Sequence, residues 1–212
     1  VELGPFDYQN ENYTRQLWAI EGVTSFYDDY FLYLSGVSTI AEYLKTVSDN
    51  INTVENTPGD AYQTLAESSF DAWIKYYRRN ENTHNNQVSY YVKGATVVTA
   101  LNLLILKATN AEQSMDDVMR ALNRRYLQNP EKGYTEDELL EVCETVAGIP
   151  LKEFFDAHIF GNEPIDYNEY LSLAGLHLHN NNKDEYQIGW TLTNKEGKYI
   201  ITSYRPFANV FI

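Results

Sequence analysis

The sequence has little of several features that would narrow its function at once. A single cysteine, Cys143, excludes an internal disulfide framework and any zinc site built from several cysteines. Its place in an amphipathic pattern is typical of a buried small hydrophobe. Only 16 lysines and arginines stand against 30 aspartates and glutamates, so the net charge is −14. This charge argues against nucleic acid and against an anionic membrane surface as partners.

Long apolar runs and a targeting segment are also lacking. The longest apolar run, residues 95–108, includes Asn102 and Lys107, so we expect a core helix there and no membrane span. Residues 1–8 contain neither a charged start nor an apolar signal region, and they look like a cut made inside a larger protein. We therefore expect a soluble protein, and the sequence does not determine its cellular compartment.

The common hydrolase motifs are missing as well. None of His84, His158, His177 and His179 is followed by glutamate, so the helical His-Glu-x-x-His zinc motif does not occur. The sequence has no Gly-rich phosphate loop and no Gly-x-Ser-x-Gly nucleophile elbow. His177 and His179 would share one face of a strand, where they could bind a metal weakly.

What the sequence does have is a regular succession of helix signals. The 212 residues have room for one sizeable core, and the 18 tyrosines supply amphipathic side chains for a core and a cleft wall. Apolar periodicity with caps at Ser114, Thr135 and Asp166 predicts an all-α region up to about residue 175. The predicted helices cover residues 13–35, 38–54 with a Ser38 cap, 65–77, 89–106, 115–127, 137–147, 151–160 and 167–174, and residues 78–87 are a predicted surface loop.

The pattern changes from helix to strand after residue 175. Residues 176–179 alternate between apolar and polar, and residues 186–193 and 198–204 flank a turn at 194–197 as a hairpin. This tail is too short to bury a core of its own. We interpret it as the truncated start of a β domain.

The first predicted helix carries a carboxylate, Glu21, within its apolar part. A charge beside a buried stripe is costly unless something pairs with it. Two interpretations stay open: a half-exposed or salt-bridged glutamate, or a carboxylate that binds a metal. Gly22 would let another segment or an ion come close. The residues predicted to form the buried stripe are Leu17, Ile20, Phe31 and Leu34.

Three polar residues follow Glu21 at helical spacing, namely Thr24, Ser25 and Asp28. Hydroxyls and a second acid at these positions are candidates to orient a metal-bound Glu21 through hydrogen bonds.

The second candidate is a tyrosine pair at the mouth of the most apolar helix. A phenol at a helix start, such as Tyr91, can point into a cleft and donate a hydrogen bond to a developing oxyanion. The alternative is that Tyr91 is one more core tyrosine. Tyr90 and Lys93 are further cleft candidates, although a lysine in a first turn is ordinarily solvated.

Two stretches, residues 3–29 and 88–105, resemble the glycyl aminopeptidase family of zinc metallopeptidases. In that family a thermolysin-like catalytic domain is followed by a PDZ domain. The Trp-x-x-Glu-Gly and Tyr-x-Lys-Gly-Ala motifs are also similar to those of the alanyl aminopeptidases, which belong to the same gluzincin clan. A looser similarity continues to residue 178, and residues 188–207 resemble the first strands of the PDZ domain.

This resemblance implies roles for two residues. Glu21 would be the third protein ligand of a catalytic zinc, after two histidines, and Tyr91 would stabilise the oxyanion of the tetrahedral intermediate. A zinc with three protein ligands and one open position activates water and polarises the scissile carbonyl. In the family, the His-Glu-x-x-His helix lies just before the stretch that residues 3–8 resemble, so both histidines and the general base are expected to be missing here. We therefore expect no zinc at the catalytic site of this chain and no peptide hydrolysis by it alone.

The overall expectation is a mainly α chain. Residues 1–178 would be the helical C-terminal half of a thermolysin-like metallopeptidase domain, and residues 179–212 a truncated PDZ-like β segment. The complete enzyme would use zinc to hydrolyse N-terminal peptide bonds after small residues such as Gly or Ala. The alternative is a non-catalytic helical module that binds a peptide or a protein. Surface exposed by truncation would favour self-association.

Overall fold

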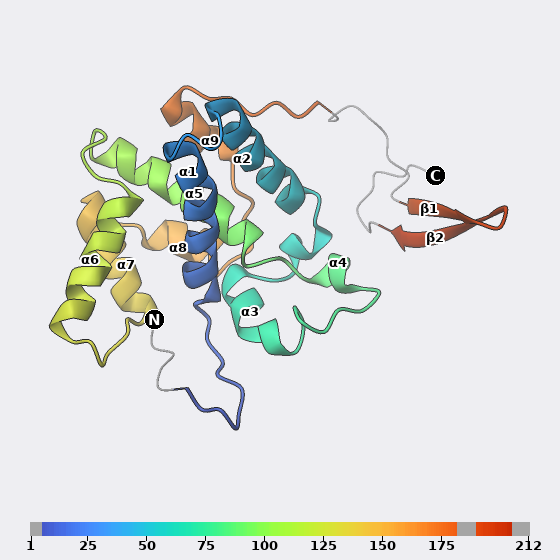
Figure 1. Ribbon diagram of the computed structural model, residues 1–212, viewed down its shortest axis with the longest axis horizontal. Coiled ribbons are helices and arrows are strands. Elements are labelled where there is room, and N and C mark those ends of the chain that lie inside the picture. The colour runs from blue at the N-terminus through green and yellow to red at the C-terminus, as the bar shows by residue number, and fades with distance from the viewer. Residues whose placement is uncertain (1–5, 182–189, 205–212) are drawn as a thin grey trace.

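The protein is described here from a computed structural model, which covers residues 6–181 and 190–204. Its described part is mainly helical and ends in a two-stranded sheet, as the sequence predicts (Figure 1). The strands are β1 (Trp190–Lys195) and β2 (Lys198–Tyr204). The helices are the π-helix η1 (Trp18–Gly22), α1 (Val23–Leu34), α2 (Ile40–Glu55), the 3-10 turn η2 (Pro58–Ala61), α3 (Leu65–Phe70), the 3-10 turn η3 (Asp71–Trp73), α4 (Thr83–Asn86), α5 (Val92–Ala108), α6 (Met115–Gln128), α7 (Glu136–Ala147), α8 (Lys152–His158), α9 (Tyr167–Leu171) and the 3-10 turn η4 (Ser172–Ala174).

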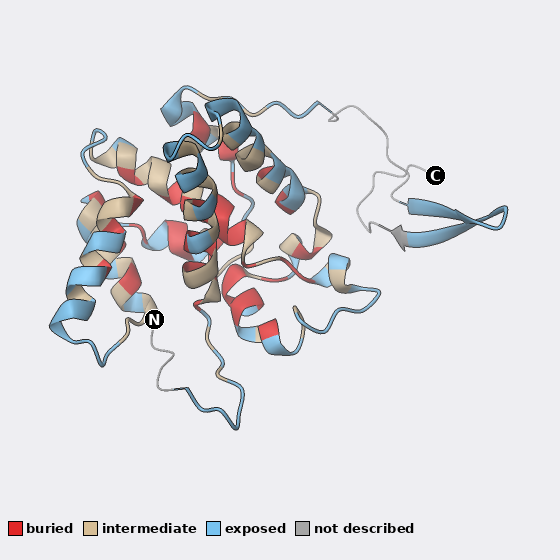
Figure 2. Cartoon of the chain, viewed as in Figure 1, coloured by how far each residue is buried: buried red, intermediate tan, exposed pale blue. Residues whose placement is uncertain are grey.

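Helix α5 is the centre of this helical body. It packs against η1, α1, α2, α6, α7 and α9, and buried residues gather along it (Figure 2). A helix surrounded on most sides must be apolar around most of its circumference, which explains the sequence of residues 92–108. None of the helices in the described ranges is long and apolar enough to cross a membrane. The fully buried residues of α5 include Val97, Val98, Leu101 and Ile105.

Side-chain caps fix where several helices begin. The predicted caps Ser114 and Thr135 form capping boxes with Asp117 and Glu138, in which each side chain accepts from the other residue's backbone N–H. Asp166 caps α9 as predicted, because its carboxylate accepts from two backbone N–H groups of the first turn. The start of α2 differs from the prediction, since Thr39 rather than Ser38 caps it in a capping box. Helix α3 begins at Leu65 as predicted, and Thr64 caps it in a capping box.

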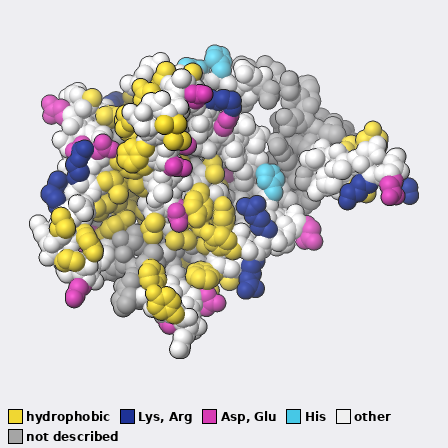
Figure 3. Space-filling view, viewed as in Figure 1, with side chains coloured by type: hydrophobic (Ala, Val, Ile, Leu, Met, Phe, Trp, Pro, Cys, Tyr) yellow, Lys and Arg dark blue, Asp and Glu magenta, His cyan; other side chains and the backbone are white. Residues whose placement is uncertain are grey.

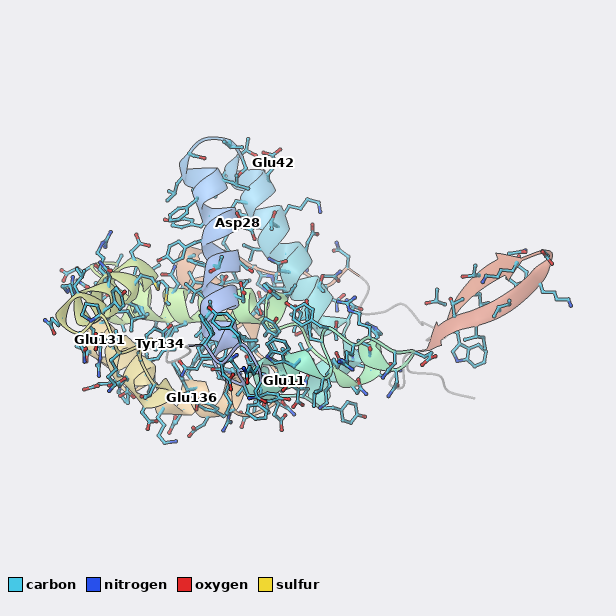
Figure 4. The ribbon with its side chains drawn as sticks, turned by 60° about the horizontal axis from the view of Figure 1, so that its bottom comes forward. Glu11, Asp28, Glu42, Glu131, Tyr134 and Glu136 are labelled. Carbon is cyan, nitrogen blue, oxygen red and sulfur yellow. The ribbon has the colours of Figure 1, made fainter. Side chains whose placement is uncertain are left out.

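The first helix is shorter than predicted. It begins at Trp18 rather than Tyr13, and its first turn is a π-helix, which continues into α1. The predicted buried stripe is wrong in its outer part, because the side chains of Phe31 and Leu34 are exposed. Figure 4 shows the reason: beyond Asp28, α1 projects from the body. The residues that are buried instead are Trp18, Ala19, Val23 and Phe26.

The apolar spacing within residues 65–77 predicts one buried face, and the structure shows that face exposed. Its members are Phe70, Trp73, Ile74 and Tyr77. Helix α3 ends at Phe70, and a 3-10 turn replaces the rest of the predicted helix. Tyr13 stacks on Phe70 with ring centroids 5.0 Å apart. Figure 3 shows hydrophobic side chains gathered on the lower part of the molecular surface in view. We refer to the following exposed residues as the aromatic patch: Tyr13, Phe70, Trp73, Ile74 and Tyr77.

We expect the aromatic patch to cause self-association of this chain. Covering two large apolar side chains removes enough surface from water to change an association constant by at least about tenfold. The double variant Trp73→Ser/Ile74→Ser should therefore shift the monomer–dimer equilibrium toward monomer in analytical ultracentrifugation. Tyr199→Ser, which removes an exposed aromatic side chain from the hairpin, is the control and should have no such effect. A wild-type chain that stays monomeric at every concentration contradicts the prediction.

The predicted hairpin is confirmed in its described part. Strands β1 and β2 pair antiparallel up to Lys195 and Lys198, and the turn residues Glu196 and Gly197 have φ values of 53° and 81°. Positive φ at both central residues is the geometry that a two-residue hairpin turn requires. The predicted strand residues 186–189 lie outside the described residues. The PDZ-like assignment and the domain boundary after residue 178 stay predictions.

Candidate active site

The candidate site lies where η1 crosses the start of α5. The two helices meet at glycines, Gly22 and Gly94. A Cβ atom on Gly22 would lie 2.7 Å from Cα of Gly94, and one on Gly94 would lie 2.8 Å from Cα of Gly22. Such distances are too short for any side chain. Glycine at both positions therefore permits the backbones of the two motifs to touch, with Glu21 and Lys93 as the preceding residues.

The π-helical turn that carries Glu21 is held by neighbouring groups. The backbone N–H of Trp18 donates to Oγ of the buried Ser69 at 3.0 Å. The N–H groups of Ala19 and Ile20 both donate to the carbonyl oxygen of Gln16. A π-turn has one more residue per turn than an α-turn, and it is frequent at functional sites. Glu21 itself is half-buried.

Three tyrosine hydroxyls meet beside α5. The hydroxyl of Tyr77 lies 3.1 Å from that of Tyr90 and 3.3 Å from that of Tyr91, with either partner able to donate. The rings of Tyr90 and Tyr91 stack with centroids 4.6 Å apart. Tyr90 is 1% exposed, so it belongs to the core, whereas Tyr91 is half-buried and directly precedes the first residue of α5. Tyr91 is therefore the tyrosine of this pair that is placed at the edge of the core.

The Tyr91 phenol keeps its proton at neutral pH. Desolvation by burial raises the pKa of Tyr91 to about 12, and the hydrogen bond between Tyr91 and Tyr77 acts in the same direction. The negative charge of Glu21 also raises the pKa of Tyr91. The two side chains are therefore close enough to interact electrostatically. The site thus combines a carboxylate with a phenol that is available as a hydrogen-bond donor.

Lys93 is not the solvated lysine that its position in a first turn predicts. Its side chain is 2% exposed, and Nζ lies 2.6 Å from a carboxylate oxygen of Asp60 in η2. A buried ammonium needs such a partner because its desolvation is costly. The solvated interpretation of Lys93 is therefore wrong, and the lysine is part of the structure behind the site.

The polar residues proposed to support Glu21 have separate surroundings. The hydroxyl of Thr24 donates to the carbonyl oxygen of Ile20 at 2.7 Å, and Thr24 is exposed. Asp28 is exposed on α1, and Ser25 is half-buried. Their role as hydrogen-bond partners of Glu21 stays a prediction.

Two residues of the site were not singled out from the sequence. Tyr77 was assigned to an apolar face, although the repeated Tyr-Tyr pairs at 76–77 and 90–91 are a signal that could have connected it to Tyr91. Asp60 was placed in a loop, and no local pattern points from it to Lys93. Pairing residues 33 positions apart in sequence requires the tertiary fold.

The residues around Glu21 do not by themselves make a metal site. Within residues 6–181 and 190–204 there is no group of three or more His, Cys, Asp or Glu side chains that could hold a metal ion. Zinc sites in proteins use three or four protein ligands. The two histidines at 177 and 179 lie outside any strand with ring centroids 5.0 Å apart, and both are exposed. Glu21 can therefore contribute only part of a zinc site.

The candidate site does not coincide with a sizeable hollow in the described residues. That hollow, of about 530 Å³, lies between α6 and the loop before α7, and Met119, Tyr126 and Tyr134 are among its lining residues. None of the lining residues belongs to the Glu21–Tyr91 site. Volume alone therefore does not locate the chemistry of this chain.

The fold of the chain is similar to part of an aminopeptidase structure. The structure is similar to a crystal structure of an aminopeptidase N family protein from Idiomarina loihiensis, with a TM-score of 0.75 and 34% sequence identity. The similarity covers 79% of this chain but only 28% of that chain. Residues 1–97 match the family model of the M61 glycyl aminopeptidases. Both findings support this family and confirm the resemblance seen in the sequence. No curated protein matches the chain.

Proposed function

We propose that this chain supplies one carboxylate ligand and the oxyanion-binding phenol to the active site of a zinc aminopeptidase. The proposal assigns these roles to Glu21 and Tyr91. The remaining zinc ligands and the general base would come from a His-Glu-x-x-His segment of the complete enzyme. Because the chain spans only 28% of the matched structure, such a segment has room in a protein of that length.

One observation carries this proposal. The backbone contact between Gly22 and Gly94 brings the Trp-x-x-Glu-Gly motif against the Tyr-x-Lys-Gly-Ala motif. Two motifs that are about 70 residues apart in the sequence therefore meet at their glycines, and the charge of Glu21 acts on the Tyr91 phenol. Two helix segments that packed only for stability would not need their chemistry-bearing residues at the point of closest approach.

The two residues would have different tasks. When bound by three protein ligands, zinc activates a water molecule and polarises the scissile carbonyl. Glu21 would hold the metal through its carboxylate. Tyr91 would donate a hydrogen bond from its hydroxyl to the negative charge that develops on the carbonyl oxygen, and its raised pKa of about 12 keeps that donor present at neutral pH. Tyr77, in contact with the Tyr91 hydroxyl, would orient it.

The family resemblance supports small N-terminal residues, such as Gly or Ala, as the preferred substrates. It also supports the proposal that the chain alone does not hydrolyse peptides, since the described residues offer no complete set of metal ligands. The partner of the site would be a peptide with a free N-terminus.

Zinc content tests the role of Glu21. We expect about one zinc per molecule in the full-length protein that carries this chain, and none at this site in the chain alone. Glu21→Gln should lower the zinc affinity of the full-length protein by at least about a hundredfold, because a neutral amide is a poor zinc ligand. Glu11→Gln, which removes the charge of an exposed glutamate earlier in the chain, is the matched control and should keep zinc and activity.

If the Glu21→Gln variant retains stoichiometric zinc, Glu21 is not a zinc ligand. Zinc bound by the chain alone points to another site, for which His177 and His179 are the candidates. In that case the double variant His177→Ala/His179→Ala would remove it.

The aromatic patch favours a second candidate function, a non-catalytic module that binds a peptide or a protein. Its members are exposed, and Tyr77 connects the patch to the Tyr91 hydroxyl. A full-length protein without zinc or aminopeptidase activity, but with peptide binding that Trp73→Ser abolishes, would support this function instead.

A further inference from the structure

The first turn of α5 is fastened to η2 by a buried ion pair. Lys93 lies two residues after Tyr91, and its ammonium nitrogen is 2.6 Å from a carboxylate oxygen of Asp60. The Lys93 side chain is 2% exposed and that of Asp60 is 24% exposed. The lysine side chain therefore crosses the interior and reaches its partner at the edge of the core.

Uncharged contacts join the same two segments. Gly59 packs so closely on residue 87 that a Cβ atom would lie 2.1 Å from the carbonyl oxygen of Gln87. The backbone N–H of Val88 donates to the side-chain oxygen of the buried Gln63 at 3.0 Å. Residues 59–63 thus hold both the approach to α5 and its first turn.

A second carboxylate shares the lysine. Desolvation and the charge of Asp60 raise the pKa of Glu55, while Lys93 acts in the opposite direction. Glu55 is the last residue of α2, so Lys93 is the cation between the ends of two neighbouring segments. Removing it would leave the mutual repulsion of the Glu55 and Asp60 charges without a cation to offset it.

Two neighbouring segments contact the first turn of α5: η1 through the glycine contact and η2 through the ion pair. Gly94 fixes the distance of α5 from η1, where Glu21 lies, and Lys93 fixes its attachment to η2. Tyr91 directly precedes this turn, and its carbonyl oxygen accepts the backbone N–H of Ala95 at 2.9 Å. Any movement of this turn therefore moves the Tyr91 side chain with respect to Glu21.

Stability alone is a weak reason for such a pair. Buried ion pairs can often be replaced by apolar residues without loss of stability, because their desolvation cost offsets their attraction. What a charged pair adds is a single preferred geometry. We propose that Lys93 and Asp60 are positioning residues, which hold the Tyr91 phenol at its place beside Glu21. This inference rests on the proposed function for the role of Tyr91, while Lys93 itself contacts no substrate.

The Tyr91 phenol can be observed directly in this chain. Tyrosine labelled with ¹³C at Cζ gives one signal per residue, and the Tyr91 signal is the one missing from a Tyr91→Phe sample. In the wild type, Tyr91 should remain protonated at about pH 10, where an ordinary tyrosine is half ionised. In the double variant Lys93→Met/Asp60→Asn, we expect a changed Cζ shift at neutral pH and an ionised fraction near one half at about pH 10.

A matched control tests whether the loss of a Lys–Asp pair elsewhere in the chain also changes the Tyr91 signal. Lys152 and Asp156 form an exposed ion pair on α8, and Lys152→Met/Asp156→Asn should leave the Tyr91 signal unchanged. A folded Lys93→Met/Asp60→Asn variant with a wild-type Tyr91 signal and titration overturns the proposal. If far-UV circular dichroism shows that this variant is unfolded, Asp60→Asn alone is measured by the same criterion, with a smaller shift in the same direction expected.

The measurement needs neither zinc nor turnover. Loss of the Glu21 assignment in the zinc experiment would therefore leave this result intact. Conversely, an unchanged Tyr91 signal would remove the positioning role while leaving Tyr91 as the oxyanion donor.

Discussion

Replacing Tyr91 by phenylalanine should lower kcat of the full-length enzyme by about two to three orders of magnitude and leave KM nearly unchanged. The substitution removes only the hydroxyl, so the ring can still stack on Tyr90. A hydrogen bond to an oxyanion exists in the transition state and not in the ground state, and its loss therefore appears in kcat. The measurement is steady-state hydrolysis of a chromogenic glycyl or alanyl substrate.

Zinc content of the same Tyr91→Phe sample should equal that of the wild type, because the phenol is not a metal ligand in the proposal. Tyr134→Phe is the matched control. Burial also raises the pKa of Tyr134 to about 12, but Tyr134 lies in the loop before α7 and lines the hollow beside α6. A Tyr91→Phe enzyme that keeps kcat within about threefold contradicts a role in oxyanion binding.

Local rules predicted the helix starts well. Capping at Ser114, Thr135 and Asp166 depends on side chains within three residues of one another, and all three are observed. Cys143 is buried as predicted, and burial raises the pKa of its thiol to about 12. These features follow from short-range spacing and need no knowledge of the rest of the fold.

The buried face of the first helix could not be predicted in the same way. An α-helical period was assumed from residue 13 onward, but the π-turn at Trp18–Gly22 contains more residues per turn and shifts the phase of the face that follows. The outer part of α1 also projects beyond the body, so Phe31 has no partner helix to bury it. Both effects depend on where α5 lies.

The sequence suggests the chemistry of the proposed site but not the residues that support it. Glu21 and Tyr91 were identified because their motifs resemble those of a family, and a family motif records residues that act together. The partners Tyr77 and Asp60 lie on other segments, and an amphipathic pattern does not show which distant residue a side chain reaches. For Lys93, the general rule for exposed lysines gave the wrong environment.

Alanine at Gly94 should destabilise the chain by about 1–3 kcal/mol, despite the better helix propensity of alanine. An added Cβ would lie 2.8 Å from Cα of Gly22, and backbone atoms cannot move aside as a flexible side chain can. Gly22→Ala should have a similar effect for the same reason. The measurement is urea denaturation of the chain followed by far-UV circular dichroism.

The sign of the stability change shows whether the backbones of η1 and α5 are in close contact at Gly22 and Gly94. Without a close contact, Gly94→Ala would stabilise α5 by about 1 kcal/mol, because glycine is a poor helix former. Since one separation of the backbones relieves both clashes, the Gly22→Ala/Gly94→Ala variant should lose less stability than the sum of the single variants. A stabilised Gly94→Ala chain, or strictly additive losses, would mean that η1 and α5 do not touch at these residues. The same separation would move Tyr91 away from Glu21, so the full-length Gly94→Ala enzyme should lose kcat even where it remains folded.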